Sequence, residues 1–284
     1  MMADISIVIP IYNEELAIEK TIAEIKKAIS GLKHRFEIIA VNDGSKDKTS
    51  EIIGNIKGIK AINHPYNKGY GSSIKTGIKA SKAEWILITD SDGTYPIKDI
   101  PKLISYINDY DMVIGARRKT KMPILRKPAK FILSSLSNFL TGKKIPDLNS
   151  GFRIFKKDLA LRFFSLFPSG FSFTTTITLA ALTNEYNVKY IPIDYYKREG
   201  KSKMKPGEFI NFITLILRII TFFEPIKIFS LISFILFLIA IIIFIYTAYF
   251  ADKVADITVI VIVLASIQIF LFGLIADMIA RKRN

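Results

Sequence analysis

The C-terminal end of the chain contains two long apolar runs that constrain its fold more than any other feature. Residues 228–250 carry no charged side chain, and the apolar character resumes at 257–276 after a short polar break. At a helical rise of about 1.5 Å per residue, each run can cross a hydrocarbon core of roughly 30 Å. Two buried core helices would need far more surrounding protein than a chain of 284 residues offers. The sequence therefore predicts a two-helix transmembrane hairpin over residues 226–284.

Charged residues flank the two predicted spans asymmetrically. Lys227 precedes the first span and three basic residues at 281–283 follow the second, whereas the connecting loop carries one Lys and two Asp. Because positive flanks stay on the cytoplasmic side of a membrane, we expect both the N-terminal domain and the C-terminus in the cytoplasm. Residues 207–225 combine a wide apolar face with Arg218, which predicts an amphipathic interfacial helix ahead of the hairpin.

The composition excludes several kinds of site and indicates the charge of the partners. The chain has no cysteine, so disulfides, thiolate metal sites and a cysteine nucleophile are excluded. Its two histidines, His34 and His64, both fall in predicted loops, which disfavours a multi-histidine metal site. Lys and Arg outnumber Asp and Glu by 40 to 25, a net charge of +15. Such a balance indicates nucleic acid, an anionic membrane face or phosphorylated substrates as partners.

The first 115 residues alternate between apolar strand patterns and helical periods. The predicted strands cover residues 5–9, 36–41, 59–62, 85–89 and 112–114, and the predicted helices cover 14–30, 48–56, 72–80 and 97–108. This alternation predicts an α/β domain with a mostly parallel sheet covered by helices on both faces. In such sheets ligands bind beyond the carboxyl ends of the strands.

Three polar clusters fall at those strand ends, at residues 10–14, 42–45 and 90–93. Asp90 and Asp92 are two residues apart, and carboxylates of this kind suit Mg²⁺ or Mn²⁺ shared with a substrate diphosphate. Each cluster taken alone could be a turn or a helix cap. Three of them on one edge favour a nucleotide crevice. The sequence has no Walker loop and no strict GxGxxG, which disfavours an ATPase or a nicotinamide enzyme.

Basic residues gather in two segments. Residues 112–146 contain nine basic residues and no acidic one, and a second basic cluster covers 197–205. Attraction to anionic lipid, worth about 1 kcal/mol per basic residue near the surface, accounts for part of this charge. A subset of these side chains could instead clamp a phosphate group.

Six motifs occur in a fixed order along the chain. They are IPIYNE at 9–14, VNDGS at 41–45, NKGYG at 67–71, DSDG at 90–93, GAR at 115–117 and DLNSGFR at 147–153. This series resembles the inverting GT-A-fold glycosyltransferases of the dolichol-phosphate mannose synthase and polyprenyl-phosphate glucose synthase group. The resemblance implies a Rossmann-like GT-A domain over residues 1–206, followed by the interfacial helix and the hairpin. It also implies transfer of a hexose from a nucleotide sugar to a polyprenyl phosphate with inversion.

The resemblance implies roles at the matching positions for the donor and the metal. The nucleotide sugar would be held by Pro10, Tyr12, Glu14, Asp43, Gly69, Asp90, Ser91, Arg198 and Lys203. Asp90 and Asp92 would bind Mg²⁺ or Mn²⁺. Relatives of the mannose-synthase type carry a Gln as a further metal ligand where this chain has Thr94, so water could take that place.

The resemblance also implies an acceptor site and a catalytic set. The acceptor phosphate would meet Arg117, Lys130, Ser134 and Asn138, and the catalytic residues would be Asp92, Arg117 and Asp147. A lipid monophosphate is already an anionic nucleophile near neutral pH, so the site needs to position and neutralise charge rather than supply a strong base. Asp147 is either an orienting carboxylate or weak base, or a loop residue tied to Arg153.

Several alternatives stay open at the level of the sequence. A UDP-linked glucose or N-acetylglucosamine is favoured as donor because residues 93–96 depart from the mannose-synthase pattern, with GDP-mannose as the alternative. The acceptor could be dolichyl or undecaprenyl phosphate, and the spans could mediate homo-oligomer formation by analogy. Other readings are a glycosyltransferase acting on a lipid-linked saccharide and a non-catalytic membrane-associated regulator. Nucleic acid is disfavoured because stacking aromatics beside the basic residues are not evident.

Overall fold

A seven-stranded mixed sheet forms the centre of the N-terminal unit in the computed structural model, which describes residues 3–118, 127–170, 172–196, 222–250 and 256–283. Its strands are β1 (Ile5–Ile11), β2 (Phe36–Asn42), β3 (Lys60–Asn63), β4 (Trp85–Ile88), β5 (Met112–Arg117), β6 (Arg153–Lys156) and β7 (Val188–Ile193). The strand order is β3-β2-β1-β4-β6-β5-β7. Strand β6 runs antiparallel to both of its neighbours, and every other pairing is parallel. The prediction of a mostly parallel α/β sheet is confirmed.

All five predicted strands are present, and the described residues form two more that the sequence pattern does not predict. Strand β6 is only four residues long, and β7 is an edge strand that is half-buried over much of its length and contains Pro192. Proline is confined to edges and bulges of sheets because it cannot donate a ladder hydrogen bond. Neither segment therefore shows the continuous apolar pattern by which the strands of the sheet centre are found.

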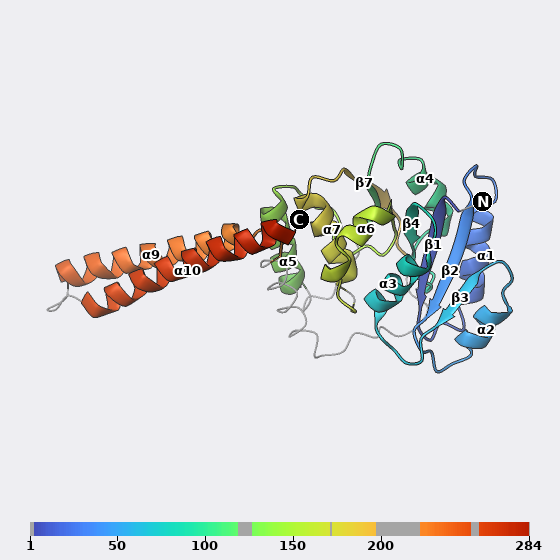
Figure 1. Cartoon of the computed structure of the whole chain (residues 1–284), viewed down its shortest axis with the longest axis horizontal. Helices are drawn as coiled ribbons and strands as arrows, with labels where there is room; N and C mark the ends of the chain where they lie inside the picture. Colours follow the sequence, from blue (N-terminus) through green and yellow to red (C-terminus); the bar gives the residue numbers. More distant parts are fainter. Residues whose placement is uncertain (1–2, 119–126, 171, 197–221, 251–255, 284) are drawn as a thin grey trace. The chain divides into compact units, whose positions relative to one another are not determined.

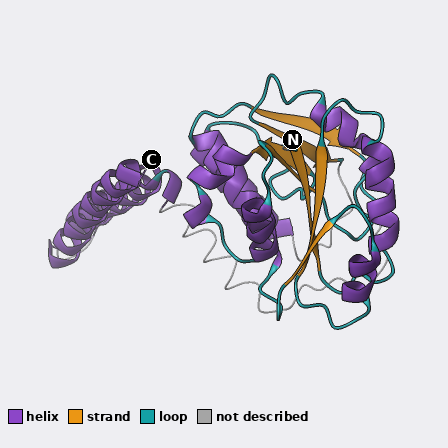
Figure 2. Ribbon diagram, turned by 45° about the vertical axis from the view of Figure 1, so that its right-hand side comes forward, coloured by secondary structure: helices purple, strands orange, loops and turns teal. Residues whose placement is uncertain are grey.

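Helices cover both faces of the sheet (Figure 2). They are α1 (Ile18–Ile29), α2 (Thr49–Asn55), α3 (Tyr70–Ala80), α4 (Ile100–Ile104), α5 (Lys127–Thr141), α6 (Lys157–Arg162) and α7 (Phe173–Thr183), with short 3₁₀ turns at Ile97–Asp99 and Phe164–Leu166. Figure 1 shows α3, α6 and α7 on the side of the sheet away from α1. Helix α1 starts at Ile18, four residues later than predicted, and a turn precedes it in which the N–H groups of Ala17 and Ile18 both donate to the carbonyl of Glu14 (3.1 and 3.0 Å).

The core lies between the sheet and these two helical layers. On one face, alternate isoleucines of β1 (Ile5, Ile7, Ile9 and Ile11) are buried against the apolar side of α1. On the other face, α3 approaches β1 so closely that a Cβ atom at Gly77 would lie 2.3 Å from Val8 Cγ1. These contacts fix the two helices that follow β1 and precede β4, and with them the loops at the carboxyl edge of the sheet.

The C-terminal unit, residues 206–284, contains two long apolar helices, α9 (Pro225–Phe250) and α10 (Asp256–Arg283). Both are long and apolar enough to cross a membrane. In α9 only Pro225 and Ala240 are buried, so most of its large apolar side chains are exposed. Such a surface is typical of a protein segment that faces lipid. By length, composition and exposure, the two helices fit the predicted transmembrane hairpin.

Helices α9 and α10 pack closely where small residues lie between them. A Cβ atom at Gly273 would lie 2.5 Å from Phe229 Cβ, and the Ser233 hydroxyl donates a hydrogen bond of 2.8 Å to the carbonyl of Ser266. Close approach at small residues and hydroxyl bonds between helices are typical of membrane helix pairs. The predicted interfacial helix at 207–225 lies, up to residue 221, outside the described residues.

Candidate active site at the carboxyl edge of the sheet

The carboxyl ends of β1, β2, β4 and β5 meet at one edge of the sheet. The parallel register pairs Ile11 with Asn42 and Val8 with Ile88, and β6 begins at this edge beside Ile88 and Ile114. The three polar clusters predicted from the sequence therefore follow neighbouring strands on the same side of the domain. The loop that leads into β6 reaches the same edge of the sheet, about sixty residues after β4 in the sequence.

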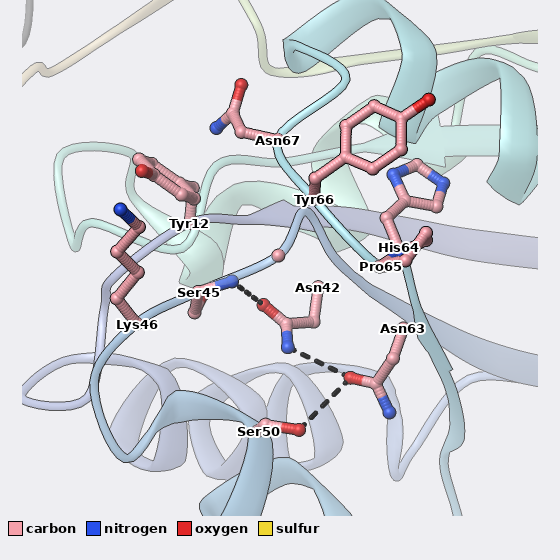
Figure 3. Close-up of a pocket in the computed structure, with 11 residues that line it drawn as sticks. Tyr12, Asn42, Ser45, Lys46, Ser50, Asn63, His64, Pro65, Tyr66 and Asn67 are labelled. Carbon is pink, nitrogen blue, oxygen red and sulfur yellow. Dashed lines mark hydrogen bonds between the residues drawn. The ribbon is translucent and has the colours of Figure 1, made fainter.

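A pocket of about 350 Å³ opens beyond the ends of β1, β2 and β3 (Figure 3). It is lined by Tyr12, Asn42, Gly44, Ser45, Lys46, Ser50, Asn63, His64, Pro65, Tyr66 and Asn67. A chain of hydrogen bonds fixes one wall: the amide of Asn42 donates through Nδ2 to Asn63 Oδ1 at 2.9 Å, and its Oδ1 accepts from the N–H of Ser45 at 3.1 Å. The lining combines aromatic rings with hydroxyl and amide groups, and such a mixture is typical of small-molecule pockets. Of the residues predicted to hold the nucleotide sugar, Tyr12 lies in this lining.

Asp43 organises the loop that forms the opposite wall of the pocket. Its buried carboxylate accepts hydrogen bonds from the backbone N–H groups of Lys68 (2.9 Å) and Gly69 (2.8 Å), and it lies 2.7 Å from His64 Nδ1. The other ring nitrogen of His64 lies 2.9 Å from Thr76 Oγ1 on α3. His64 is a loop residue, as predicted, but its burial against Asp43 was not predicted. Direct contact of Asp43 with a nucleotide stays a prediction.

Gly69 has a packing role in the structure. It adopts a φ of 97°, and a Cβ atom there would lie 2.6 Å from the carbonyl oxygen of Ser169. The N–H of Ser72 donates to the same carbonyl at 3.0 Å. The start of α3 is therefore held against residues 168–170, and a nucleotide contact at Gly69 stays a prediction.

Each of the two acidic residues after β4 is held by a hydroxyl group. Tyr70 donates to Asp90 Oδ1 at 2.9 Å, and Thr94 donates to Asp92 Oδ1 through its hydroxyl at 2.6 Å and its N–H at 3.1 Å. Ser91 is buried between them and donates to the carbonyl of Pro10 at 3.4 Å. Thr94 thus orients one of the two carboxylates, and Ser91 and Pro10 tie the ends of β4 and β1 together.

Two tyrosines of this region are kept protonated. Burial raises the pKa of Tyr70 well above its usual range, and the nearby charge of Asp90 adds to the effect. Burial likewise raises the pKa of Tyr95, whose hydroxyl accepts the N–H of Gly151 at 2.7 Å. Tyr70 is therefore a hydrogen-bond donor to Asp90 throughout the neutral range.

Arg117, at the end of β5, forms a bidentate ion pair with Asp147. Its Nε and Nη2 lie 2.7 and 2.9 Å from the two carboxylate oxygens, and its backbone N–H donates to the same carboxylate at 3.1 Å. The guanidinium also lies over the ring of Tyr195, 5.2 Å from the centroid. Burial acts to raise the pKa of Asp147, but the hydrogen bonds and charge of Arg117 outweigh it and hold that pKa below its usual range.

The alternative that ties Asp147 to Arg153 is wrong. The hydrogen bonds of Arg153 go to neutral partners instead: its side chain is fully buried and donates to the carbonyls of Ser150 (2.8 Å) and Thr174 (3.0 Å) and to Thr178 Oγ1 (2.8 Å). Burial lowers the pKa of Arg153. These bonds shape the segment between Asp147 and β6 without neutralising a carboxylate.

The predicted acceptor residues are only partly within the described structure. Ser134 and Asn138 lie one turn apart on α5, and Asn138 Oδ1 accepts the N–H of Ile145 at 3.0 Å. That bond ties the end of α5 to the segment that leads to Asp147. The side chain of Lys130, and both Arg198 and Lys203, lie outside the described residues.

The donor set at Asp90 and Asp92 fits a hard divalent cation. Within the described residues no group of three or more His, Asp or Glu side chains gathers at one point. Two carboxylates oriented by hydroxyl donors suit Mg²⁺ or Mn²⁺ when the remaining positions are filled by water and substrate oxygens. Glu14 and Pro10 follow or end β1 at the same edge, but neither lines the pocket.

Comparison with known proteins agrees with this arrangement. The family model described as glycosyl transferase family 2 matches residues 6–164, and the model described as the GtrB C-terminal hairpin matches residues 224–281. The first match covers strands β1 to β6 and the polar edge, and the second covers most of the two apolar helices.

Two curated relatives show the range of names in the group. A dolichyl-phosphate hexose transferase of Haloferax volcanii is 32% identical over 207 residues, which cover 72% of this chain and 87% of that protein. An undecaprenyl-phosphate 4-deoxy-4-formamido-L-arabinose transferase of Photorhabdus laumondii is 29% identical over 245 residues, covering 81% of this chain and 71% of that protein.

Among solved structures, the chain is similar to glucosyl-3-phosphoglycerate synthase from Mycobacterium tuberculosis in complex with uridine diphosphate. The TM-score is 0.60 at 18% identity, with 76% of this chain and 80% of that chain covered. A second structure of that enzyme, with Mn²⁺, UDP-glucose and phosphoglyceric acid, has a TM-score of 0.60 at 19% identity over 76% and 80% of the two chains. At this identity the likeness concerns the fold, and it identifies the N-terminal unit as a GT-A domain.

Proposed function

The chain belongs to glycosyl transferase family 2, and from that membership we propose that it transfers a hexose from a nucleotide sugar to a polyprenyl phosphate in a membrane. The names of the relatives support a polyprenyl-phosphate acceptor, since they include dolichyl-phosphate and undecaprenyl-phosphate transferases. The membrane hairpin supports it as well, because such an acceptor is lipid-soluble. In this proposal residues 1–206 form the catalytic domain, 207–225 an interfacial helix and 226–284 the anchor.

The observation that carries the proposal is the pair of oriented carboxylates, Asp90 and Asp92, on the same sheet edge as the pocket beside Tyr12. A nucleoside would occupy the pocket, and its diphosphate would lie toward the two carboxylates. When bound there, a divalent cation would neutralise the charge of the departing nucleoside diphosphate. Asp90 and Asp92 are the residues that would hold it.

The acceptor side would depend on Arg117, which Asp147 holds in a fixed orientation. An oxygen of the lipid phosphate would form the new bond to the anomeric carbon as the bond to the nucleoside diphosphate breaks on the opposite face, which inverts the configuration. The phosphate already carries the negative charge of the nucleophile, so the residues of the site orient and neutralise it. Lys130, Ser134 and Asn138 on α5 would extend this basic acceptor site.

UDP-glucose or UDP-N-acetylglucosamine is the proposed donor, with GDP-mannose as the alternative. A relative named dolichyl-phosphate beta-glucosyltransferase, from Trichomonas vaginalis, is 29% identical over 242 residues, 76% of this chain and 71% of its own length. Its name supports a glucose donor. The positive flanks of the hairpin support a cytoplasmic catalytic domain and C-terminus, on the side of the membrane where nucleotide sugars are available.

The test offers the purified full chain a panel of these nucleotide sugars, with dolichyl or undecaprenyl phosphate and Mn²⁺. The expected result is a labelled lipid-phosphate hexose from one UDP-sugar, inverted at the anomeric carbon when the product is examined by NMR. The matched control replaces the lipid phosphate with the corresponding free polyprenol, which should give no product. Absence of lipid-linked sugar with every donor would contradict the proposal.

A further inference from the structure

Tyr70 and Gly151 both lie against the carboxylate of Asp90. The Tyr70 hydroxyl donates to Asp90 Oδ1 at 2.9 Å. A Cβ atom placed on Gly151 would lie 2.9 Å from that same oxygen, 3.0 Å from Oδ2 and 2.9 Å from the Tyr70 hydroxyl oxygen. Contacts below 3.4 Å are tighter than most Cβ atoms make, so any side chain at position 151 would displace the carboxylate, the phenol or the loop.

The backbone positions of both residues are fixed by contacts outside the carboxylate pair. Tyr70 opens α3, where the N–H of Ser72 bonds to the carbonyl of Ser169 and a Cβ atom at Gly71 would lie 2.3 Å from the carbonyl oxygen of Pro168. Gly151 donates its N–H to the hydroxyl of Tyr95 at 2.7 Å. The phenol of Tyr70 therefore approaches Asp90 from an element that cannot slide along the sheet edge.

We propose that Tyr70 is a positioning residue that orients the Asp90 carboxylate for a divalent cation, and that Gly151 preserves the space in which this contact forms. The proposal rests on the proposed function, in which Asp90 and Asp92 hold the cation. Asp92 receives its hydroxyl bond from Thr94, two residues away in the same turn. Asp90 receives its hydroxyl bond from Tyr70 on helix α3, so the orientation of its carboxylate depends on how α3 packs.

A donor that fixes a ligating carboxylate reduces the reorientation needed when the metal binds. Loss of such an outer contact weakens metal affinity by roughly 10- to 100-fold in metal sites generally. We therefore expect Tyr70→Phe, which keeps the ring and removes the hydroxyl, to raise the Kd for Mn²⁺ about 10-fold.

The experiment measures Mn²⁺ binding to the purified full chain by electron paramagnetic resonance, with UDP present as the probe nucleotide. Tyr70→Phe should bind Mn²⁺ more weakly than the wild type, while UDP binding without metal and the thermal unfolding midpoint stay close to those of the wild type. Tyr106→Phe is the matched control, because Tyr106 lies at the end of α4 against Tyr110 and Lys189. It should leave the Kd for Mn²⁺ unchanged.

Gly151→Ala provides a second test, since its added methyl group would crowd both the Asp90 carboxylate and the Tyr70 hydroxyl. It too should weaken Mn²⁺ binding. Wild-type Mn²⁺ affinity in either Tyr70→Phe or Gly151→Ala would overturn the proposal, as would a wild-type chain that binds no Mn²⁺ with UDP. A wild-type chain that binds Mn²⁺ but transfers no sugar would contradict the proposed function, while the binding data would still support the role of Tyr70.

Discussion

Arg117 and Asp147, thirty residues apart in the sequence, form an ion pair with three hydrogen bonds at the edge of the sheet. The side chains are 25% and 9% exposed, so most of the pair is shielded from water. An arginine held this way presents its charge in one orientation. An anionic acceptor that binds here would lose less conformational entropy than one that binds a flexible arginine, because the guanidinium is already oriented.

Asp147→Ala should destabilise the domain by about 3–5 kcal/mol, because it leaves the charge of Arg117 buried without its partner. The free energy of unfolding, measured by denaturant titration in detergent, tests this value. The matched control is Asp194→Ala in the neighbouring pair between Arg118 and Asp194, whose side chains are 70% and 55% exposed. An exposed pair of this kind contributes about 0–1 kcal/mol, so an equal loss in both variants would contradict the prediction.

The same ion pair predicts a dependence of stability on acid. The pKa of Asp147 is lowered in the folded chain, so its contribution is fully present above the usual aspartate value of 3.8 and is lost as the pH falls through the folded value. The stability of the wild type should therefore decline below about pH 4 more steeply than that of Asp147→Asn. Parallel acid profiles for the two proteins would show that Asp147 does not contribute in this way.

Asp92→Ala should abolish sugar transfer while the thermal unfolding midpoint stays near that of the wild type. The residue lies half-exposed in a loop, so its loss removes a proposed ligand and one hydroxyl bond without opening the core. Asp109→Ala, at an exposed position beyond α4, is the control and should keep full turnover. Unchanged turnover in Asp92→Ala would remove this residue from the proposed metal site.

Two glycines on helices provide a test of the packing between α3 and β1. Gly77→Ala should destabilise the domain by about 2 kcal/mol, because the new Cβ atom would lie 2.3 Å from Val8 Cγ1. Gly54→Ala, on α2, meets nothing within 4 Å and should stabilise by up to about 1 kcal/mol through helix propensity. Thermal unfolding of the two variants should shift in opposite directions, and shifts of the same sign would show that the contact is more tolerant.

Lys130→Ala should raise the KM for the polyprenyl phosphate several-fold and leave the KM for the nucleotide sugar unchanged. The expected reason is the loss of one positive charge on α5, the helix that also carries Ser134 and Asn138. Lys143→Ala, an exposed lysine just after α5, is the control for a general loss of positive charge. Equal effects of the two substitutions would assign Lys130 to attraction of the whole surface to lipid.

The sequence was sufficient to predict the sheet centre and the membrane hairpin, because both depend on local apolar patterns. The strands at 5–9, 36–41 and 85–89 all lie in the sheet, each within two residues of the predicted ends. Strand β6 escaped prediction because four residues, one of them the fully buried Arg153, carry no readable period. Its antiparallel direction is a property of the chain path, which no local pattern contains.

The candidate site was predictable in its residue types but less so in its contacts. The spacing at the end of a strand predicts Asp90 and Asp92 as metal ligands. It could not show that the hydroxyl of Tyr70, on helix α3, reaches Asp90. The ion-pair partner of Asp147 could not be predicted either, since Arg153 and Arg117 are equally good partners until the fold is known. His64 shows the same point, because its burial against Asp43 depends on the register between β2 and β3.

The position of β6 between β4 and β5 has an evolutionary consequence. Strand β5 ends, and β6 begins, at the same edge of the sheet, so the connection between them starts and finishes beside the candidate site. Because its two ends lie at the same edge, this connection can change in length and sequence between them without shifting the strands on either side. Under the proposed function, selection for a different acceptor can therefore act on this connection, while the first four strands, with the pocket beside Tyr12, remain under separate constraint.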